Sequence, residues 1–292
     1  PLPLREGDVI LTSEAPLGKT AFVPSNDPLV LGQRLFALRG KADVIDNAYL
    51  RYWLESEVGQ AQLAGRASGT TVLGIRQALL RKVEIDLPPL KVQRSVGKFL
   101  KALDDKITAN VRVLETANEL VKNLYTAIPK SSNHAIESIG ELVKKNVKPE
   151  EMDVSKALIN LEHFDSKQIW ISRHAQVPEA TSAKSSFLVG DVLFGKLRPY
   201  FHKVGVAPIG GYCSTDVLVV RPREDSYRGL LLAAMSAEET VAVATQNSNG
   251  TRMPRAKWAD IASCAIPDPD DPKSIELGKL MDVLIPKCNA LI

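Results

Sequence analysis

The sequence predicts an α+β fold in which two duplicated α/β domains are joined by long helices that pair as an antiparallel coiled coil. Three observations lead to this prediction: motifs that recur along the chain, a heptad pattern between the two copies, and a globular composition. Hydrophobic residues make up 45% of the 292 residues and charged residues 24%, as in soluble globular proteins. Aromatic residues contribute only 5%, so the core must consist mainly of aliphatic side chains.

Four motifs recur in the same order at a nearly constant spacing of 181 to 183 residues. This period is far longer than the roughly 20–50 residues of a solenoid repeat, so each copy is the size of a domain. Four matches in one order predict a duplication, with the copies related by a pseudo-twofold axis. In the third pair, both segments are expected to be strands that end in prolines. The matched pairs are residues 7–10 with 190–193, 68–70 with 249–251, 83–89 with 264–269, and 96–100 with 277–281.

The duplication divides the chain into four segments. Because the first copy lacks a counterpart of residues 134–189, we expect the sequence to be a fragment of a longer protein. The net charge is 0 over residues 1–88, +4 over 89–133 and −1 over 134–292, so any polyanion binding outside the middle segment must come from local clusters. The segments are residues 1–88, the C-terminal part of the first domain; 89–130, a spacer helix; 134–270, the second domain; and 271–292, the start of a second spacer helix.

Residues 96–128 carry apolar side chains that alternate by three and four positions over more than four heptads, the pattern of a coiled-coil seam. A buried Asn110, the only polar member, would fix the register of two paired helices. Such a helix would be about 50 Å long and would set the distance between two domains. The alternative interpretation is an amphipathic core helix of a bundle. The residues expected to pack are Val96, Leu100, Leu103, Ile107, Asn110, Leu114, Val121 and Leu124.

Two loops in each copy are candidates for binding a polyanion. In the second copy, one follows a strand expected at residues 187–193 and gathers cations and aromatics around a glycine and a proline. Arg offers a planar fork to guanine or phosphate, and turns rich in Gly, Asn and Thr bring backbone N–H groups close to phosphates. The alternative is a turn flanked by solvated cations. The candidate contacts are Lys196, Arg198, Tyr200, His202, Lys203, Arg252, Arg255 and Lys257 in the second copy, and Lys19, Arg34, Gly69, Thr70 and Arg76 in the first.

No catalytic or metal-binding pattern is recognisable in the sequence. Gly18-Lys19-Thr20 ends like a phosphate-binding P-loop, but that motif requires glycine at position 13, where this chain has Ser13. The four histidines are scattered, and the three cysteines have neither metal-ligand nor disulfide-framework spacing. The longest uncharged apolar stretch, residues 230–235, is far shorter than the ~20 residues that span a bilayer. We therefore expect a protein of the reducing cytoplasm that is not an enzyme, holds no metal and binds no membrane.

The order of these features resembles the specificity subunit of type I restriction–modification enzymes. The resemblance covers nearly the whole chain. Its motifs are loose individually, whereas their order and duplication are specific. They are residues 7–10 with their longer copy at 190–200, Gly69-Thr70 with residues 250–252, and residues 87–93, which run into the long helix.

The resemblance implies a DNA-binding subunit without catalytic activity. Two target-recognition domains would each read one half of a bipartite site in double-stranded DNA, and the helices would set the gap between the halves. The chain would bind no cofactor itself. It would dock two methyltransferase subunits, which use S-adenosylmethionine to methylate adenine, and through them restriction subunits that use ATP and Mg. Residues 134–270 would then read one half-site.

Two other functions remain open from the residues alone. The chain would also fit the recognition portion of a single-chain restriction–methyltransferase, which methyltransferase motifs in a longer reading frame would reveal. Alternatively, the heptad seam dominates and the protein is a coiled-coil interaction scaffold. Absent or salt-insensitive DNA binding would favour the scaffold, because binding to the phosphate backbone weakens steeply with salt.

Overall fold

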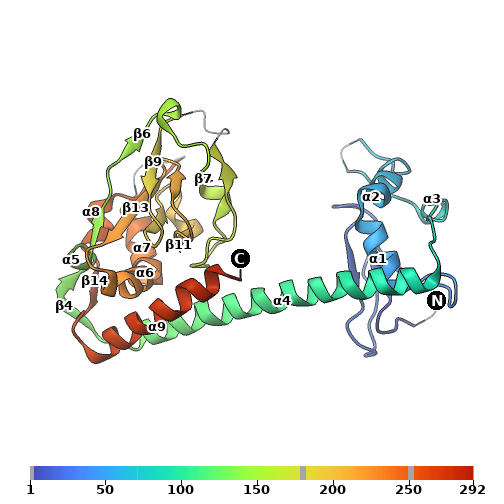
Figure 1. Cartoon of the computed structure of the whole chain (residues 1–292), viewed down its shortest axis with the longest axis horizontal. Coiled ribbons are helices and arrows are strands. Elements are labelled where there is room, and N and C mark those ends of the chain that lie inside the picture. The colour runs from blue at the N-terminus through green and yellow to red at the C-terminus, as the bar shows by residue number, and fades with distance from the viewer. Residues whose placement is uncertain (1–2, 71, 178–181, 249–252, 292) are drawn as a thin grey trace. The chain divides into compact units, whose positions relative to one another are not determined.

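The computed structural model describes residues 3–70, 72–177, 182–248 and 253–291. The chain forms two compact units, Pro1–Thr108 and Ala109–Ile292, hereafter unit 1 and unit 2 (Figure 1). Both contain helices and sheets, so the predicted α+β class is confirmed. No helix of the described chain is long and apolar enough to cross a membrane.

Unit 1 is built around a small antiparallel sheet with β1 at its centre. The alternating burial of β1 turns Val9 and Leu11 toward the helices, where they form a core with Leu50, Leu54 and Leu63. One face of the sheet is therefore covered by helices. The elements are β1 (Val9–Thr12), β2 (Thr20–Phe22), β3 (Leu35–Leu38), α1 (Asn47–Glu55), α2 (Glu57–Ala64) and α3 (Gln77–Leu80).

Polar side chains define the helix starts in unit 1. Asp46 caps α1 by accepting hydrogen bonds from the N–H groups of Ala48 and Tyr49. Ser56 ends α1 and caps α2, where its hydroxyl accepts from the N–H of Gly59. Such caps satisfy N–H groups that have no partner within the helix, and each stabilises it by about 1 kcal/mol.

The long helix α4 spans Leu90–Thr126, 37 residues, and confirms that a long helix lies within residues 89–130. In unit 1 its first turns are anchored by Gln93, which is buried. The Gln93 amide donates to the carbonyls of Val44 and Pro88, and its oxygen accepts from the N–H of Asp46. The cap of α1 and the start of α4 therefore share one hydrogen-bond network.

Unit 2 contains one four-stranded sheet, ordered β11-β10-β13-β5, one five-stranded sheet, ordered β6-β9-β12-β7-β8, and the strand pair β14-β4. The helix α6 lies against the first sheet and is buried around its whole circumference, which explains the apolar stretch at residues 230–235. Its strands are β4 (Lys130–Ala135), β5 (Gly140–Leu142), β6 (Asn146–Val147), β7 (Ala157–Ile159), β8 (Ala175–Gln176), β9 (Lys184–Phe187), β10 (Val192–Gly195), β11 (Val204–Val206), β12 (Gly211–Cys213), β13 (Val217–Pro222) and β14 (Ala265–Pro267). Its helices are α5 (Ile136–Ile139), α6 (Arg228–Ser236), α7 (Glu238–Gln246), α8 (Trp258–Ala262) and α9 (Pro272–Asn289).

Within unit 2, α9 runs antiparallel alongside the C-terminal part of α4 (Figure 1). Ala117 and Val121 of α4 belong to the same buried cluster as Leu277 and Met281 of α9. The Asn110 amide donates to the carbonyl of Leu291, just beyond the end of α9, at 3.0 Å. The predicted antiparallel pairing is thus observed, whereas Asn110, predicted to be buried, is only partly buried.

The predicted seam is wrong for four of its members. Val96, Leu103, Ile107 and Leu124 are exposed, whereas Leu100 and Leu114 are partly buried and Val121 is buried. In unit 2 the helix buries Tyr125 in place of Leu124, because its packed face follows a period of about 3.6 residues and not the heptad's 3.5. Before Asn110, no second helix in the described chain covers the stripe.

Two strand predictions also need correction. Residues 187–193 do not form one strand, because Gly190 turns the chain with φ +84° between β9 and β10. Residues 83–89 form no strand, whereas their partner segment contains β14. The difference has a physical reason: β14 is paired with β4, and the described part of unit 1 provides no such partner strand.

Candidate nucleic-acid interface

The repeated Gly-Asp motif builds a frame and not a ligand site. In unit 1, Asp8 is buried and receives a two-pronged hydrogen bond from Arg39, with Nε at 2.7 Å and Nη2 at 2.6 Å. In unit 2, Asp191 is buried and receives the same contact from Arg221, at 2.8 and 2.7 Å. The hydrogen bond from Arg39 holds the pKa of Asp8 below its ordinary value. Each pair thus ties the central strand to its neighbour.

In unit 2 the chain leaves β10 through residues 196–203, hereafter the Arg198 loop. Arg198 and His202 both adopt the left-handed conformation, with φ +51° and +49°, and flank the single helical turn Pro199–Phe201. Left-handed backbone is costly for residues other than glycine and persists only where the surroundings fix it. The N–H of Arg198 donates to the carbonyl of Pro254, and Leu197 forms a β-bridge with Arg255. The loop is therefore joined to the second candidate loop.

Unit 1 has the same backbone arrangement in residues 13–20, hereafter the Ala15 loop. Ala15 has φ +50° and precedes a proline, as Arg198 does 183 residues later. Glu14 forms a β-bridge with Gly74, matching the bridge from Leu197. The N–H of Ser13 donates to the carbonyl of Arg34, as that of Lys196 does to Asp216. The two loops therefore share a framework and present different side chains, alanine in one and arginine in the other.

The cations of unit 2 differ in how they are held. Arg255 forms a two-pronged ion pair with Asp216, at 2.8 and 3.2 Å, and Lys203 donates to the carbonyl of Leu161 at 2.7 Å. Lys196, Arg198 and Lys257 form no ion pair with any described residue. Lys257 is exposed, and Lys196 and Arg198 are partly exposed. These three side chains can therefore approach a polyanion without breaking an existing contact.

The loop also exposes two adjacent aromatic rings. Tyr200 is 52% exposed and Phe201 45% exposed, and their ring centroids lie 4.8 Å apart. Lys203 Nζ lies 5.9 Å from the Phe201 ring centroid. Phe201 was not among the predicted contacts. Because aromatic residues are scarce in this chain, the adjacent pair Tyr200 and Phe201 was the signal that could have identified it. Exposed aromatics beside cations suit contact with sugars, bases or thymine methyl groups.

His202 is the clearest error among the predicted contacts. Its side chain is only 6% exposed and points inward, and Nε2 lies 2.8 Å from the carbonyl oxygen of Ser236. A carbonyl only accepts, so Nε2 carries the proton. Burial lowers the pKa of His202 below its ordinary value. A neutral, enclosed imidazole is a structural element and is not available to DNA.

The predicted contacts of unit 1 lie at its surface, and one of them already forms an ion pair within the chain. Arg34 forms an ion pair with Glu14 at 2.9 Å, whereas Lys19, Thr70 and Arg76 are exposed. Gly69 has φ +124°, and a Cβ there would lie 2.1 Å from the Val72 carbonyl oxygen, so only glycine fits this turn. The predicted contact Arg252, with its motif neighbours Gly250 and Thr251, lies outside the described residues.

Comparison with known proteins shows what part of the chain is similar to. The family described as "Type I restriction modification DNA specificity domain" matches residues 2–118. This match covers less than half of the chain, so over these residues the chain is similar to type I specificity subunits. The chain is 28% identical over 104 residues to the Type I restriction enzyme EcoDI specificity subunit of Escherichia coli, and 30% identical over 131 residues to the Type I restriction enzyme MjaVIII specificity subunit of Methanocaldococcus jannaschii.

These matches are partial. They include 36% and 42% of this chain, but only 23% and 31% of the two relatives. The chain thus spans less than a third of the length of the curated relatives that it matches. The crystal structure of a type I restriction-modification S subunit from M. genitalium superposes with a TM-score of 0.61 at 13% identity, over 99% of this chain and 80% of that one. That likeness supports the fold.

Proposed function

We propose that this chain is the non-catalytic DNA-binding subunit of a type I restriction–modification complex, with each unit reading one half of a bipartite site. The observation that carries the proposal is the pair of loops with one backbone and different side chains. Ala15 and Arg198 occupy equivalent positions before a proline, on equivalent frames held by Asp8 and Asp191. A duplicated scaffold with divergent loops suits two different half-sites.

The chemistry of the Arg198 loop supports DNA as the ligand. Arg198 is free to form a two-pronged contact with a guanine edge, the commonest specific contact in the major groove. Lys196 and Lys257 are placed to neutralise phosphates, and exposed Tyr200 and Phe201 add contact area. Because the whole chain carries a net charge of only +3, affinity would depend on these local cations.

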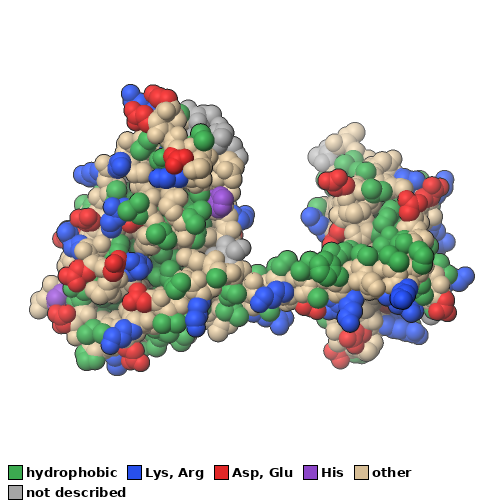
Figure 2. Space-filling model, viewed as in Figure 1, with side chains coloured by type: hydrophobic (Ala, Val, Ile, Leu, Met, Phe, Trp, Pro, Cys, Tyr) green, Lys and Arg blue, Asp and Glu red, His purple; other side chains and the backbone are tan. Residues whose placement is uncertain are grey.

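The exposed stripe on α4 supports a docking surface for methyltransferase subunits. In unit 1 the side chains of Phe99 and Ile107 are 64% and 60% exposed, and Val96 and Leu103 lie on the same helix. Figure 2 shows a band of hydrophobic side chains along α4. Exposed apolar stretches of this kind mark interaction sites. We propose that α4 both spaces the recognition units and binds the partner.

The chemistry would belong to the partners. Methylation of adenine requires the base to leave the stack and enter the pocket of another protein. On this proposal the chain holds no cofactor, S-adenosylmethionine binds to two methyltransferase subunits, and ATP and Mg bind to the restriction subunits. The complex would act in the cytoplasm.

The test is co-purification of the protein with its methyltransferase subunit, followed by methylation-sensitive sequencing of DNA exposed to the complex. A bipartite adenine motif with a fixed gap is the expected result. Failure to form a stable complex, together with absence of a gapped motif, would overturn the proposal and favour the coiled-coil scaffold. Methylation by the chain's own full-length product without a partner would instead identify a single-chain restriction–methyltransferase.

A further inference from the structure

A single buried asparagine fastens the segment before the Arg198 loop to α4. Asn118 is 7% exposed, and its amide nitrogen donates to the carbonyl of Lys167 at 3.1 Å. Its amide oxygen accepts from the N–H of Ile169, also at 3.1 Å. One turn earlier on α4, the Leu114 carbonyl accepts from the indole N–H of Trp170 at 2.9 Å. Residues 167–170 are therefore held to the helix at three points.

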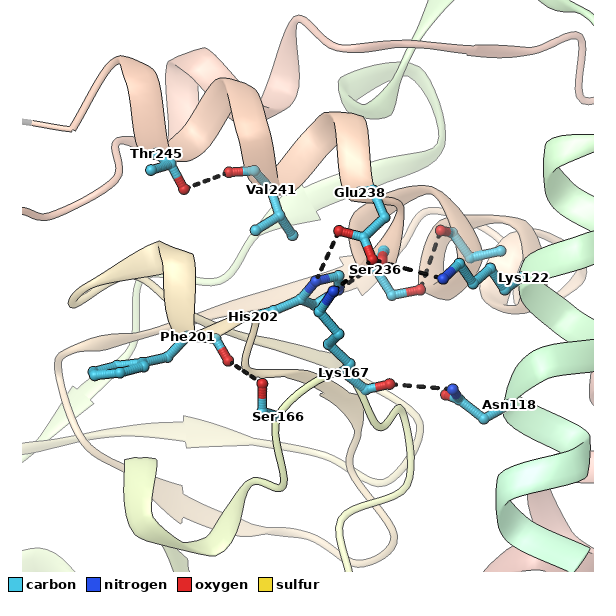
Figure 3. A network of polar contacts seen from close by, with 11 residues as sticks. Asn118, Lys122, Ser166, Lys167, Phe201, His202, Ser236, Glu238, Val241 and Thr245 are labelled. Carbon is cyan, nitrogen blue, oxygen red and sulfur yellow. Dashed lines mark hydrogen bonds and ion pairs between the residues drawn. The ribbon is translucent and has the colours of Figure 1, made fainter.

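The same segment holds the end of the Arg198 loop. The N–H of Lys167 donates to the carbonyl of His202 at 2.9 Å, and the Ser166 hydroxyl donates to the carbonyl of Phe201 at 2.8 Å. Figure 3 shows this relay, in which Asn118 reaches Lys167 from the helix while Ser166 meets Phe201 at the loop. A continuous set of hydrogen bonds thus connects α4 to the residues that follow Arg198.

The His202 ring provides a second attachment. Its Nε2–H donates to the carbonyl of Ser236, the last residue of α6, whereas the unprotonated Nδ1 lies 3.7 Å from the Glu238 carboxylate and forms no hydrogen bond with it. Glu238 also pairs with Lys167 at 3.0 Å and with Lys122 of α4 at 3.6 Å. Lys167, whose N–H holds the loop at His202, is consequently tied to α4 twice, through its carbonyl to Asn118 and through Glu238 to Lys122 (Figure 3).

Two features indicate that the polar contacts help to fix the loop's position, in addition to the packing of Ile169 and Trp170 in the same core cluster as α4. Lys167, Arg198 and His202 all adopt left-handed backbone, with φ +62°, +51° and +49°, which is unfavourable without outside support. In addition, Asn118, Lys167, His202 and Glu238 line a cavity of about 270 Å³. Because the space between loop and helix is not filled by close-packed side chains, packing does not replace the hydrogen bonds there.

We propose that Asn118 and His202 are positioning residues that fix the orientation of the Arg198 loop on the spacer helix and thereby set the stringency with which unit 2 reads its half-site. The inference rests on the proposed function of that loop. A two-pronged arginine contact with a base requires placement to within about 0.5 Å. A loosened loop would still meet phosphates, but Arg198 would discriminate less between bases.

The variant Asn118→Leu tests this proposal because it removes both amide contacts. It changes the side-chain volume only a little. Asn118→Asp retains the acceptor for Ile169 N–H and loses only the donor to Lys167, and it serves if the leucine variant does not fold. Asn123→Leu is the matched control, because Asn123 is exposed on the same helix. Each protein is assembled with its methyltransferase subunit, and hydrogen exchange and methylation of DNA with single-base changes are measured.

In Asn118→Leu, the amide of Ile169 should exchange faster, and discrimination at one half-site should fall about tenfold, within the range that one base contact supplies. Discrimination at the other half-site and assembly should match the control. Unchanged discrimination at both half-sites despite faster exchange would overturn the inference, as would equal losses at both, which indicate general destabilisation. A wild-type complex without any gapped motif would overturn the proposed function itself, before any variant is compared.

Discussion

Arg198 and Ala15 occupy the loop position at which a single side chain should have the greatest effect on half-site recognition. Replacing Arg198 by alanine is expected to reduce discrimination at one base pair of one half-site by about 1–3 kcal/mol, the value of one two-pronged arginine contact. Methylation rates on oligonucleotides with each single-base change provide the measurement. Arg173, which pairs with Asp165 at the surface of unit 2, is the control. A uniform loss across all sequences would show that Arg198 contacts phosphate instead.

His202 should make the stability of unit 2 sensitive to mild acid. Its folded-state pKa lies below the ordinary value of 6.5 because of burial, although Glu238 opposes this shift. As the pH falls through 6.5, the unfolded chain takes up a proton that the folded chain resists, so folding becomes less favourable. His202→Gln keeps an amide donor for Ser236 and does not titrate. Chemical unfolding at pH 7.5 and 5.5 should therefore show a smaller loss for the variant than for wild type, and an equal loss would contradict this account.

Single-residue roles were predicted unevenly from the sequence. The concentration of cations and aromatics correctly indicated an exposed loop at Arg198 and Tyr200. It did not reveal that His202, two positions on, turns inward, because the left-handed backbone at that residue depends on contacts with Lys167 and Ser236 that lie far along the chain. Asn118 gave no signal, since an asparagine in a helix looks the same whether it faces solvent or a buried backbone.

At the scale of elements, Gly97 of α4 permits the close approach of α1 in unit 1. A Cβ at this position would lie 2.8 Å from that of Ala48 and 3.0 Å from the N–H of Tyr49. Gly97→Ala should improve the intrinsic helix propensity by ~1 kcal/mol, but displacing the capped end of α1 costs about 1–3 kcal/mol. We expect net destabilisation of unit 1, seen as faster hydrogen exchange in α1. Thr108 is exposed on the same helix and serves as the control. Thr108→Ala should stabilise the helix or leave hydrogen exchange in α1 unchanged.

The exposed stripe of α4 makes a separate prediction about assembly. Changing Leu103 and Ile107 together to serine should leave unfolding of the isolated chain nearly unchanged, because both side chains are already exposed. Association with the methyltransferase subunit should weaken by at least tenfold, since burying each side chain would contribute about 1.5–3 kcal/mol. Titration of the partner measures this, with Lys106→Ser on the exposed surface of the same helix as the control. Undiminished association would place the docking surface elsewhere.

The heptad pattern of residues 96–128 was the most reliable structural signal in the sequence. A long helix was predicted because apolar periodicity over many turns is a strong local signal, and its antiparallel pairing was predicted because the repeat supplies a second copy of the helix. The exposure of Val96, Leu103 and Ile107 was not predicted. A heptad pattern identifies the apolar face of a helix, but it does not show which element, or which other protein, packs against that face. The prediction of a strand at residues 83–89 was wrong for the same reason. A strand forms only where a neighbouring strand pairs with it, and the local sequence does not show whether that neighbour is present.

For the whole molecule, the proposal that residues 134–270 read one half-site predicts that this segment can be exchanged with that of a similar specificity subunit. The strand β4 pairs with β14, so that Lys130 lies opposite Pro267 and the chain enters and leaves this segment side by side. Segments with adjacent ends are readily replaced without disturbing the rest of a protein. Grafting residues 134–270 from a relative of different specificity should change one half of the methylated motif and leave the other half unchanged.

The attachment to α4 sets a condition on that exchange. Asn118 and Leu114 lie outside the graft, and their partners Lys167, Ile169 and Trp170 lie inside it. A grafted segment that cannot form the hydrogen bonds to Asn118 should therefore read its new half-site with reduced stringency. Extending the graft to residues 110–270 should restore the stringency, because it also supplies the matching helix face. Sequencing the methylated sites of the two grafts side by side distinguishes them. Equal stringency in both would mean that the recognition segment positions its own loop.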